Sequence, residues 1–228
     1  MSESNELLAG IVLCGGNSRR MGYSKALLPF GNETMLQRVI RIMSQVTSPV
    51  IAVKAESQHL PELPDHLLIT QDRKPEQGPL EGIRMGLRAL EQHDGNTLKN
   101  AAAYVTSCDV PLLQPEFIQA VASQLGNAEA AVVVEDGFRH PLAAVYRTSV
   151  IPVIDRLLDA GRQRPLFLFE QVDTVLIPTQ DLLSADPKLS SLLNLNQPED
   201  YLDALKQAKL KPDPKILTQF DLLDDSSF

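Results

Sequence analysis

The chain has 228 residues, a length that suits one sizeable α/β domain or two small ones. Hydrophobic residues make up 43% of it and charged residues 22%, which is typical of a globular protein and excludes bulk disorder. Acidic residues outnumber basic ones by 29 to 21, for a formal net charge of −8. So acidic a chain lacks the basic surface that broad nucleic-acid or anionic-membrane binding requires. The same balance argues against an anionic ligand, unless positive charge is concentrated locally.

Cysteine and histidine content excludes two further classes of protein. Two cysteines form neither a disulfide framework nor a four-ligand zinc site, and no two of the four histidines have the spacing of metal ligands. The apolar runs are well short of the ~20 residues that span a bilayer. The first ten residues hold two acids and no basic cluster, which is unlike a secretory signal. We therefore expect a cytoplasmic protein that does not contact the membrane.

Short apolar segments alternate with longer helical patterns along the chain. Strands are predicted at residues 7–14, 49–55, 66–70, 101–108, 130–135, 140–147 and 173–179. Helices are predicted at residues 34–46, 80–92, 115–125, 149–160 and 198–208. Because the strands are continuously apolar, both faces of the sheet should be covered. The pattern predicts a doubly wound, mostly parallel α/β sheet in three layers.

We expect residues 1–208 to form a single domain. Residues 209–228 are expected to be a linker and an acidic C-terminal tail. The apolar side chains of this tail would allow a short turn to dock onto the body of the protein; they are Ile216, Leu217, Phe220 and Leu222.

The residues after the first predicted strand combine glycine with positive charge. Gly15 and Gly16 permit positive φ and close backbone approach, so that successive N–H groups can face a phosphate chain. The basic residues of the same loop are Arg19, Arg20 and Lys25. Residues 7–32 contain no Asp or Glu at all. The loop therefore predicts a local anion site in an otherwise acidic protein; the alternative is a glycine turn with solvated basic residues.

The loop is neither a Walker A motif nor GxGxxG. LCGGNSRRMGYSK (13–25) closely resembles the LAGGxSxRMGxxK signature of the molybdenum cofactor guanylyltransferase family, the MobA-like nucleotidyltransferases. Four later segments resemble further motifs of that family in its own order: GPLEGI (78–83), SCDVPLL (107–113), HPLAAVYR (140–147) and NLNQPED (194–200). The resemblance covers about residues 8–205. It implies a Rossmann-like nucleotidyltransferase fold and Mg²⁺-dependent transfer of GMP from GTP to the terminal phosphate of molybdopterin, with release of pyrophosphate.

The resemblance also implies roles for individual residues. The catalytic residues would be Arg20 and Lys25, which bind the triphosphate, and Asp109, which holds Mg²⁺. Contacts with the nucleotide are implied for Leu13, Cys14, Gly15, Gly16, Lys25, Asp72, Gly78 and Asp109. Contacts with molybdopterin are implied for His140, Pro141, Asn194 and Asn196. The partners would be these two small-molecule substrates, with contact to other molybdenum cofactor enzymes.

Local sequence leaves simpler explanations open for several of these residues. Asp109 also suits a turn or a helix cap, and Asp72 suits a salt bridge within its loop. One of Asn194 and Asn196 would serve as a cap before the last helix. Arg147 is interpreted as a residue without a substrate role.

Some positions depart from the family pattern. Ser24 stands where many relatives have Asp, and Glu81 replaces Ala and is expected to add negative charge near the site. Cys14 and Cys108 each end a predicted strand, so we expect free thiols that border the crevice near the nucleotide. The alternatives for function are a molybdopterin cytidylyltransferase, another small-molecule nucleotidyltransferase, or an inactive nucleotide-binding regulatory module.

Overall fold

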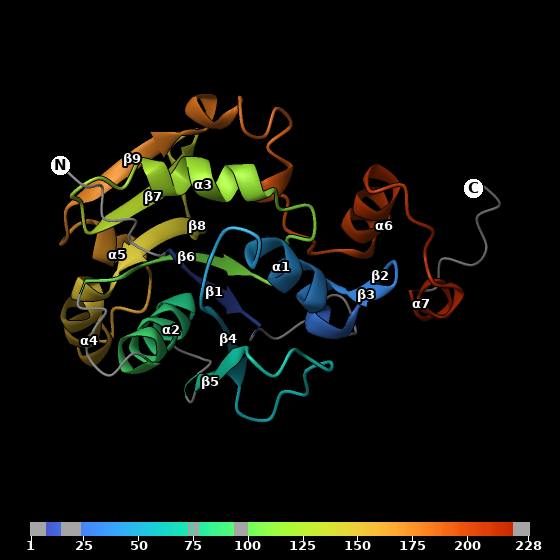
Figure 1. Cartoon of the computed structure of the whole chain (residues 1–228), viewed down its shortest axis with the longest axis horizontal. Coiled ribbons are helices and arrows are strands. Elements are labelled where there is room, and N and C mark those ends of the chain that lie inside the picture. Colours follow the sequence, from blue (N-terminus) through green and yellow to red (C-terminus); the bar gives the residue numbers. More distant parts are fainter. Residues whose placement is uncertain (1–7, 15–23, 73, 75–77, 94–99, 221–228) are drawn as a thin grey trace.

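The computed structural model describes residues 8–14, 24–72, 74, 78–93 and 100–220, and its centre is one seven-stranded sheet (Figure 1). The strand order is β5-β4-β1-β6-β8-β7-β9. The strands are β1 (Ala9–Leu13), β4 (Val50–Ala55), β5 (Leu68–Asp72), β6 (Ala102–Ser107), β7 (Ala130–Glu135), β8 (Phe138–Arg147) and β9 (Thr174–Pro178). All run in one direction except β8, which is antiparallel to both of its neighbours. The predicted mostly parallel sheet is confirmed.

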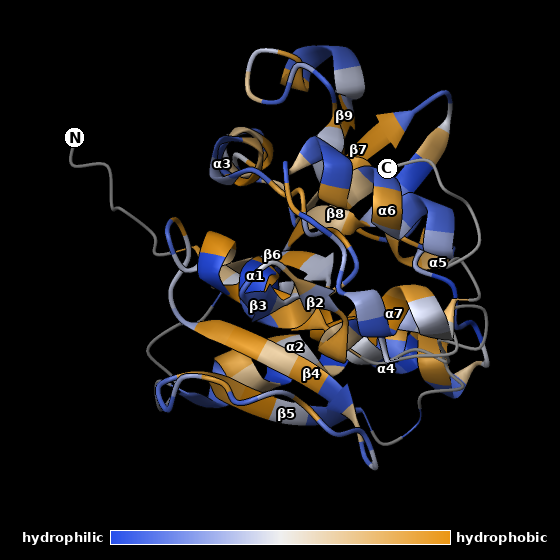
Figure 2. Ribbon diagram, turned by 90° about the vertical axis from the view of Figure 1, so that its right-hand side faces the viewer, coloured by the Kyte–Doolittle hydropathy of each residue, from blue (hydrophilic) through white to orange (hydrophobic). Residues whose placement is uncertain are grey.

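Helices cover both faces of the sheet. The core on one face is built with α1 (Met35–Met43) and α3 (Pro115–Ser123). The core on the other face is built with α2 (Pro79–His93), α4 (Ile151–Asp159) and α5 (Leu166–Phe169). The two helical layers lie on either side of the strands in Figure 2, where the apolar residues of the sheet are orange. This is the predicted three-layer arrangement.

Local sequence explains where the elements begin. Helix α1 starts at a capping box. The backbone N–H of Gln37 donates to Oγ1 of Thr34, and the backbone N–H of Thr34 donates to Oε1 of Gln37. Helix α4 follows a 3₁₀ turn at Thr148–Val150, and Pro152 lies in its first turn, where its missing N–H costs nothing. Among the described residues, no helix is long and apolar enough to cross a membrane.

A third apolar cluster lies beside the sheet, at the end of the molecule where Figure 1 shows α6 and α7. It joins the short ribbon of β2 (Pro29–Phe30) and β3 (Glu33–Thr34) to α6 (Pro198–Gln207) and α7 (Pro214–Gln219). The Tyr201 hydroxyl donates to the carbonyl of Pro29, and its ring packs edge-on against Phe30 and Phe220. Ile216 of α7 is buried in the same cluster. Part of the expected tail is therefore helical and packed.

The strand order reverses between β1 and β6. From β1 the chain adds β4 and β5 on one side and then crosses to β6 on the other. The ends of these strands are joined by backbone bonds, since the Cys108 N–H donates to the Leu13 carbonyl at 3.1 Å and the Cys14 N–H to the Val53 carbonyl at 2.8 Å. In open α/β sheets, ligands bind outside the carboxyl ends of the strands at such a switch point.

Helix α2 lies unusually close to β1. A Cβ on Gly86 would be 2.6 Å from Cγ2 of Ile11, and one on Gly82 would be 3.2 Å from Cδ1 of Leu13. A side chain at Gly86 would force the helix away from the sheet. The glycines of α2 therefore set the start of this helix against the end of β1.

Candidate functional site

A cavity of about 330 Å³ opens at the carboxyl ends of the central strands. Each of β1, β4, β5 and β6 contributes a residue to its wall, and the start of α2 forms one side. The lining residues are Leu13, Val53, Asp72, Gly78, Pro79, Gly82, Ser107, Asp109, Leu142 and Asn194. The cavity therefore lies at the topological switch point.

Lys25, Asp109 and Asn196 come together although they are far apart in sequence. Nζ of Lys25 donates to Oδ2 of Asp109 at 2.7 Å and to Oδ1 of Asn196 at 2.9 Å. The hydroxyl of Ser107 donates to Oδ1 of Asp109. The side chains of Lys25 and Asp109 are 16% and 15% exposed, so this ion pair is shielded but open to a ligand. Both oxygens of Asp109 thus have a donor beside them.

The segment before α6 is held through its backbone N–H groups. The Leu195 N–H donates to the carbonyl of Asp109 at 3.0 Å. Oδ2 of Asp200 accepts from the N–H groups of both Asn196 and Gln197, at 2.9 Å each. The cap of α6 therefore comes from Asp200 rather than from either asparagine. Asn194 lines the cavity, and Asn196 contacts Lys25.

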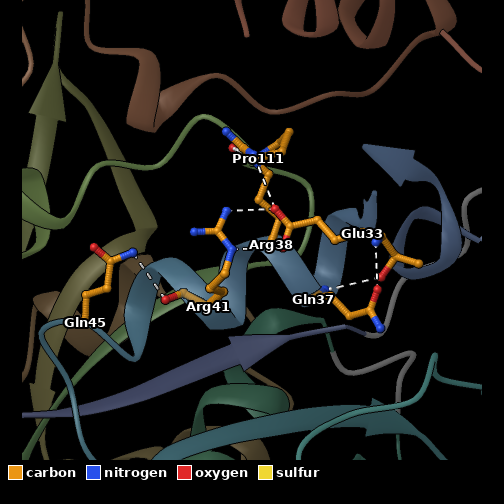
Figure 3. Close-up of polar contacts among 7 residues, drawn as sticks. Glu33, Gln37, Arg38, Arg41, Gln45 and Pro111 are labelled. Carbon is orange, nitrogen blue, oxygen red and sulfur yellow. Dashed lines mark hydrogen bonds and ion pairs between the residues drawn. The ribbon is translucent and has the colours of Figure 1, made fainter. Parts of the chain in front are cut away.

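The loop after Asp109 is tied to α1, as Figure 3 shows. Nε of Arg38 donates to the carbonyl of Pro111 at 2.7 Å, and its guanidinium carbon lies 4.9 Å from the centre of the Phe30 ring. Glu33 accepts hydrogen bonds from Arg38 and Arg41. The bond from Arg41 is the main reason that the pKa of Glu33 lies below its ordinary value. This network supports the strand end that carries Asp109.

Asp72 and Gly78 also line the cavity. Asp72 is 8% exposed, and its Oδ1 accepts from the backbone N–H of Lys74 at 2.8 Å. This is a local turn contact of the kind that aspartate favours. Gly78 has a φ of +69° directly before Pro79 opens α2. Free N–H groups in the first turn of a helix suit an anion or a close ligand.

Glu81 does not add negative charge to the cavity, so that expectation was wrong. Its side chain is buried, and both of its oxygens pair with Arg84, at 2.7 and 2.8 Å. Arg84 also reaches Asp155 of α4 at 3.0 Å, and Arg88 reaches the other oxygen of Asp155 at 2.7 Å. Glu81 therefore belongs to an ionic network between α2 and α4.

A second cavity of about 200 Å³ adjoins the first, and the two share Leu142 and Asn194. It contains the predicted residues His140, Pro141 and Asn194; the rest of its lining is Val110, Phe138, Leu142, Ala143, Ser191 and Leu192. Burial lowers the pKa of His140, although Glu135 partly opposes this effect. His140 is therefore largely neutral at pH 7.

The other predicted site residues are Cys14 and three residues of the loop that follows it. Gly15, Gly16 and Arg20 fall outside the described residues. The side chain of Cys14 packs in the apolar core, while its N–H donates to Val53 and its carbonyl accepts from Nε2 of Gln58 at 2.8 Å.

The two thiols correct one expectation. Cys14 and Cys108 are free but buried in the same core cluster, so neither side chain borders the cavity. Burial raises the pKa of Cys14 to about 12 and raises that of Cys108 well above its ordinary value. Arg147, for which no substrate role was expected, is buried. It donates to the carbonyls of Asn100, Gly126 and Ala128.

Several residues of the site were missed from the sequence. Ser107 is the last residue of β6 and Val53 lies in the second half of β4; a signal was available because the carboxyl ends of parallel strands meet at one edge of the sheet. Phe138 precedes a predicted strand by two residues and was not singled out. Its solvent exposure depends on the hairpin geometry, which sequence does not show.

The sheet and its edge cavity place the chain among the doubly wound α/β proteins that bind a ligand at the carboxyl ends of their strands. Residues 10–175 match the family of MobA-like NTP transferase domains. The chain is 32% identical to a probable molybdenum cofactor guanylyltransferase of Carboxydothermus hydrogenoformans, over 88% of this chain and 96% of that protein. It is 39% identical to the probable molybdenum cofactor guanylyltransferase of Mycobacterium tuberculosis H37Rv, over 76% of this chain and 85% of that one.

A solved structure has the same fold. It is the molybdopterin-guanine dinucleotide biosynthesis protein A of Archaeoglobus fulgidus, which superposes with a TM-score of 0.71 at 22% identity, over 89% of this chain and 99% of that one. The chain is therefore a nucleotidyltransferase, and it belongs to the family of MobA-like NTP transferase domains.

Proposed function

We propose that this chain transfers GMP from GTP to the terminal phosphate of molybdopterin, in the cytoplasmic synthesis of the molybdenum cofactor. Its relatives named as probable molybdenum cofactor guanylyltransferases support this reaction. The observation that carries the proposal is the Lys25–Asp109 pair at the cavity that ends the central strands. A cation and a carboxylate at this place suit the triphosphate and the divalent metal of nucleotidyl transfer.

In this proposal the first cavity holds GTP. Asp72 is an acceptor-only carboxylate that would take N–H donors of guanine or a ribose hydroxyl. Leu13 and Gly78 would contact the nucleotide at close range, as would Gly15 and Gly16 of the preceding loop. Lys25 would leave Asp109 and bind the phosphates, and Arg20 would clamp them from the same loop.

The residues present fit a bound Mg²⁺. Among the described residues no group of three or more His, Cys, Asp or Glu could hold a metal on its own. Mg²⁺ needs only one or two protein carboxylates when phosphates and water complete its shell, and Asp109 supplies a hard oxygen that already has a cation beside it. When bound, the ion would neutralise charge on the phosphates.

No protein nucleophile is needed for this reaction. An oxygen of the acceptor phosphate, already ionised at pH 7, would form the new bond to the α-phosphorus of GTP. The bond to the departing pyrophosphate breaks in the same step. The chain would contribute by positioning the two substrates and by neutralising the leaving group through Lys25 and Arg20.

The second cavity would hold molybdopterin. His140, Pro141 and Asn194 line it, and Asn196, two residues after Asn194, accepts a hydrogen bond from Nζ of Lys25. Because Leu142 and Asn194 belong to both cavities, an acceptor here would lie next to the nucleotide.

Thermal unfolding with each of GTP, CTP, ATP and UTP, with and without Mg²⁺, tests the nucleotide. A ligand that binds only the folded state at 100 times its Kd adds about 2.7 kcal/mol to stability. We expect Mg²⁺–GTP to raise the melting temperature most. A larger rise with CTP would favour the cytidylyltransferase reading instead. No rise with any nucleotide would favour an inactive regulatory module.

A further inference from the structure

Phe138 is exposed to an extent that its apolar ring does not explain. Its exposed fraction is 65%, the largest for a large hydrophobic side chain in the described part of the chain. The ring lines the second cavity together with His140. Single exposed apolar residues are common at protein surfaces. An exposed aromatic ring at the wall of a cavity suggests a ligand contact instead.

The backbone around this ring is shaped to present it. Strands β7 and β8 join through a tight turn at Asp136 and Gly137, with φ values of +48° and +82°. The pairing then shifts, because Val133 lies opposite His140 whereas Val132 lies opposite Ala144. Residues 141–143 of β8 have no register partner on β7, and all three line the second cavity. Bulges of this kind redirect side chains beside active sites.

His140 offers a polar atom next to the ring. The rings of Phe138 and His140 are edge-to-face, with centroids 4.9 Å apart and planes at 84°. Nε2 of His140 is buried and makes no hydrogen bond among the described residues; its contact with Oε2 of Glu135, at 3.6 Å, is an ion pair too long for a hydrogen bond. A buried polar atom without a hydrogen bond is costly, so a ligand that supplies one gains affinity.

We propose that Phe138 and His140 form the surface that selects a fused heteroaromatic ring in the acceptor substrate. The flat face of the ring would stack on Phe138, and a ring nitrogen or oxygen would pair with Nε2 of His140. The phosphate of the same acceptor would then extend past Leu142 and Asn194 toward Asp109. A sugar or polyol phosphate has neither a flat aromatic face to stack on Phe138 nor a ring edge to pair with His140, so this surface would not select it. This inference rests on the proposed function and adds the residues that choose its acceptor.

Steady-state kinetics with saturating Mg²⁺–GTP and varied molybdopterin test this surface. We expect Phe138→Ala to raise the KM for molybdopterin about 3- to 10-fold, which is the range for loss of one aromatic contact. The KM for GTP should stay within about 2-fold of the wild-type value, since Phe138 does not line the first cavity. Phe138→Tyr should keep the wild-type KM. The matched control is Leu176→Ala on β9, which alters another exposed apolar side chain, 48% exposed.

Two results would overturn the inference. One is an unchanged KM for molybdopterin in Phe138→Ala, and the other is an equal rise in the KM for GTP. Failure of the proposed function is recognised separately, because the wild-type chain would then form no GMP–molybdopterin product. In that case the surface is tested on its own, by measuring how far the chain quenches the fluorescence of pterin-6-carboxylate. Quenching that is lost in Phe138→Ala supports it, and equal quenching or none contradicts it.

Discussion

Nζ of Lys25 lies 2.7 Å from Oδ2 of Asp109, although 84 residues separate the two in sequence. The contact joins the loop after β1 to the end of β6, the two strands between which the sheet reverses its order. It brings a positive charge to the carboxylate that we propose to hold Mg²⁺. A triphosphate entering the cavity would offer Lys25 a stronger partner and would leave Asp109 to the metal.

Ser107 should position Asp109, because its hydroxyl donates to Oδ1 of that carboxylate. We expect Ser107→Ala to raise the Mg²⁺ concentration for half-maximal activity about 10-fold, as loss of a supporting hydrogen bond does at other metal sites. Ser107→Thr should restore the wild-type value by keeping the hydroxyl. Ser123→Ala on α3 is the control, since its hydroxyl bonds only locally to Ala120. An unchanged Mg²⁺ dependence in Ser107→Ala would exclude this role.

The two cysteines should react slowly in the folded protein. Both are buried, and burial raises the pKa of each thiol, to about 12 for Cys14, so that little reactive thiolate forms at pH 8. We expect iodoacetamide to label the native chain at least ~100-fold more slowly than the unfolded chain. Mg²⁺–GTP should change the native rate little. Rapid native labelling that GTP suppresses would instead place the thiols at the nucleotide.

Glu81 should contribute to stability rather than to catalysis. Glu81→Ala would leave Arg84 with Asp155 alone and remove a buried carboxylate from the contact between α2 and α4. We expect a loss of about 1–3 kcal/mol in the free energy of unfolding, measured in urea, with the KM for GTP unchanged. Glu91→Ala, on the exposed part of the same helix, should cost less than about 0.5 kcal/mol. Tighter GTP binding in Glu81→Ala would show that this charge does act on the nucleotide.

The ion pairs of Glu33 should make the free energy of unfolding depend on pH under acidic conditions. Its pKa in the folded protein is lowered from the ordinary 4.5, chiefly by the hydrogen bond from Arg41. The stability that Glu33 contributes is therefore fully present above its ordinary pKa. It is lost as the pH falls through the lower pKa of the folded protein. The difference in unfolding free energy between wild type and Glu33→Gln should shrink from pH 6 toward pH 3. Glu56→Gln, at an exposed turn, is the control, and a difference that is constant with pH would refute the assignment.

The strands and long helices were predictable because continuous apolar segments and helical periodicity are local properties of sequence. The short ribbon of β2 and β3 and helix α5 were missed, since each is too short to show a period, whereas α7 forms where a short docked turn was expected. Of the residues predicted for the site from motifs, the structure brings Lys25, Asp109 and Asn196 into contact.

Contacts that depend on how the elements pack were not predicted. Glu81 pairs with Arg84 three residues later on α2, and only the packing of α2 against α4 brings Asp155 to the same guanidinium. The cap of α6 by Asp200 and the bulge of β8 likewise depend on backbone geometry.

Transfer of labelled GMP from α-labelled GTP to molybdopterin, with and without Mg²⁺, tests the central proposal most directly. The wild-type chain should form the product only with Mg²⁺. Asp109→Asn, nearly the same in size but without the charge, should lower kcat/KM by at least ~100-fold, a loss of about 2.7 kcal/mol in transition-state stabilisation. Asp159→Asn, exposed on α4, should keep wild-type activity and shows that removal of one acid is tolerated. Near-normal Mg²⁺-dependent transfer by a folded Asp109→Asn would contradict the account.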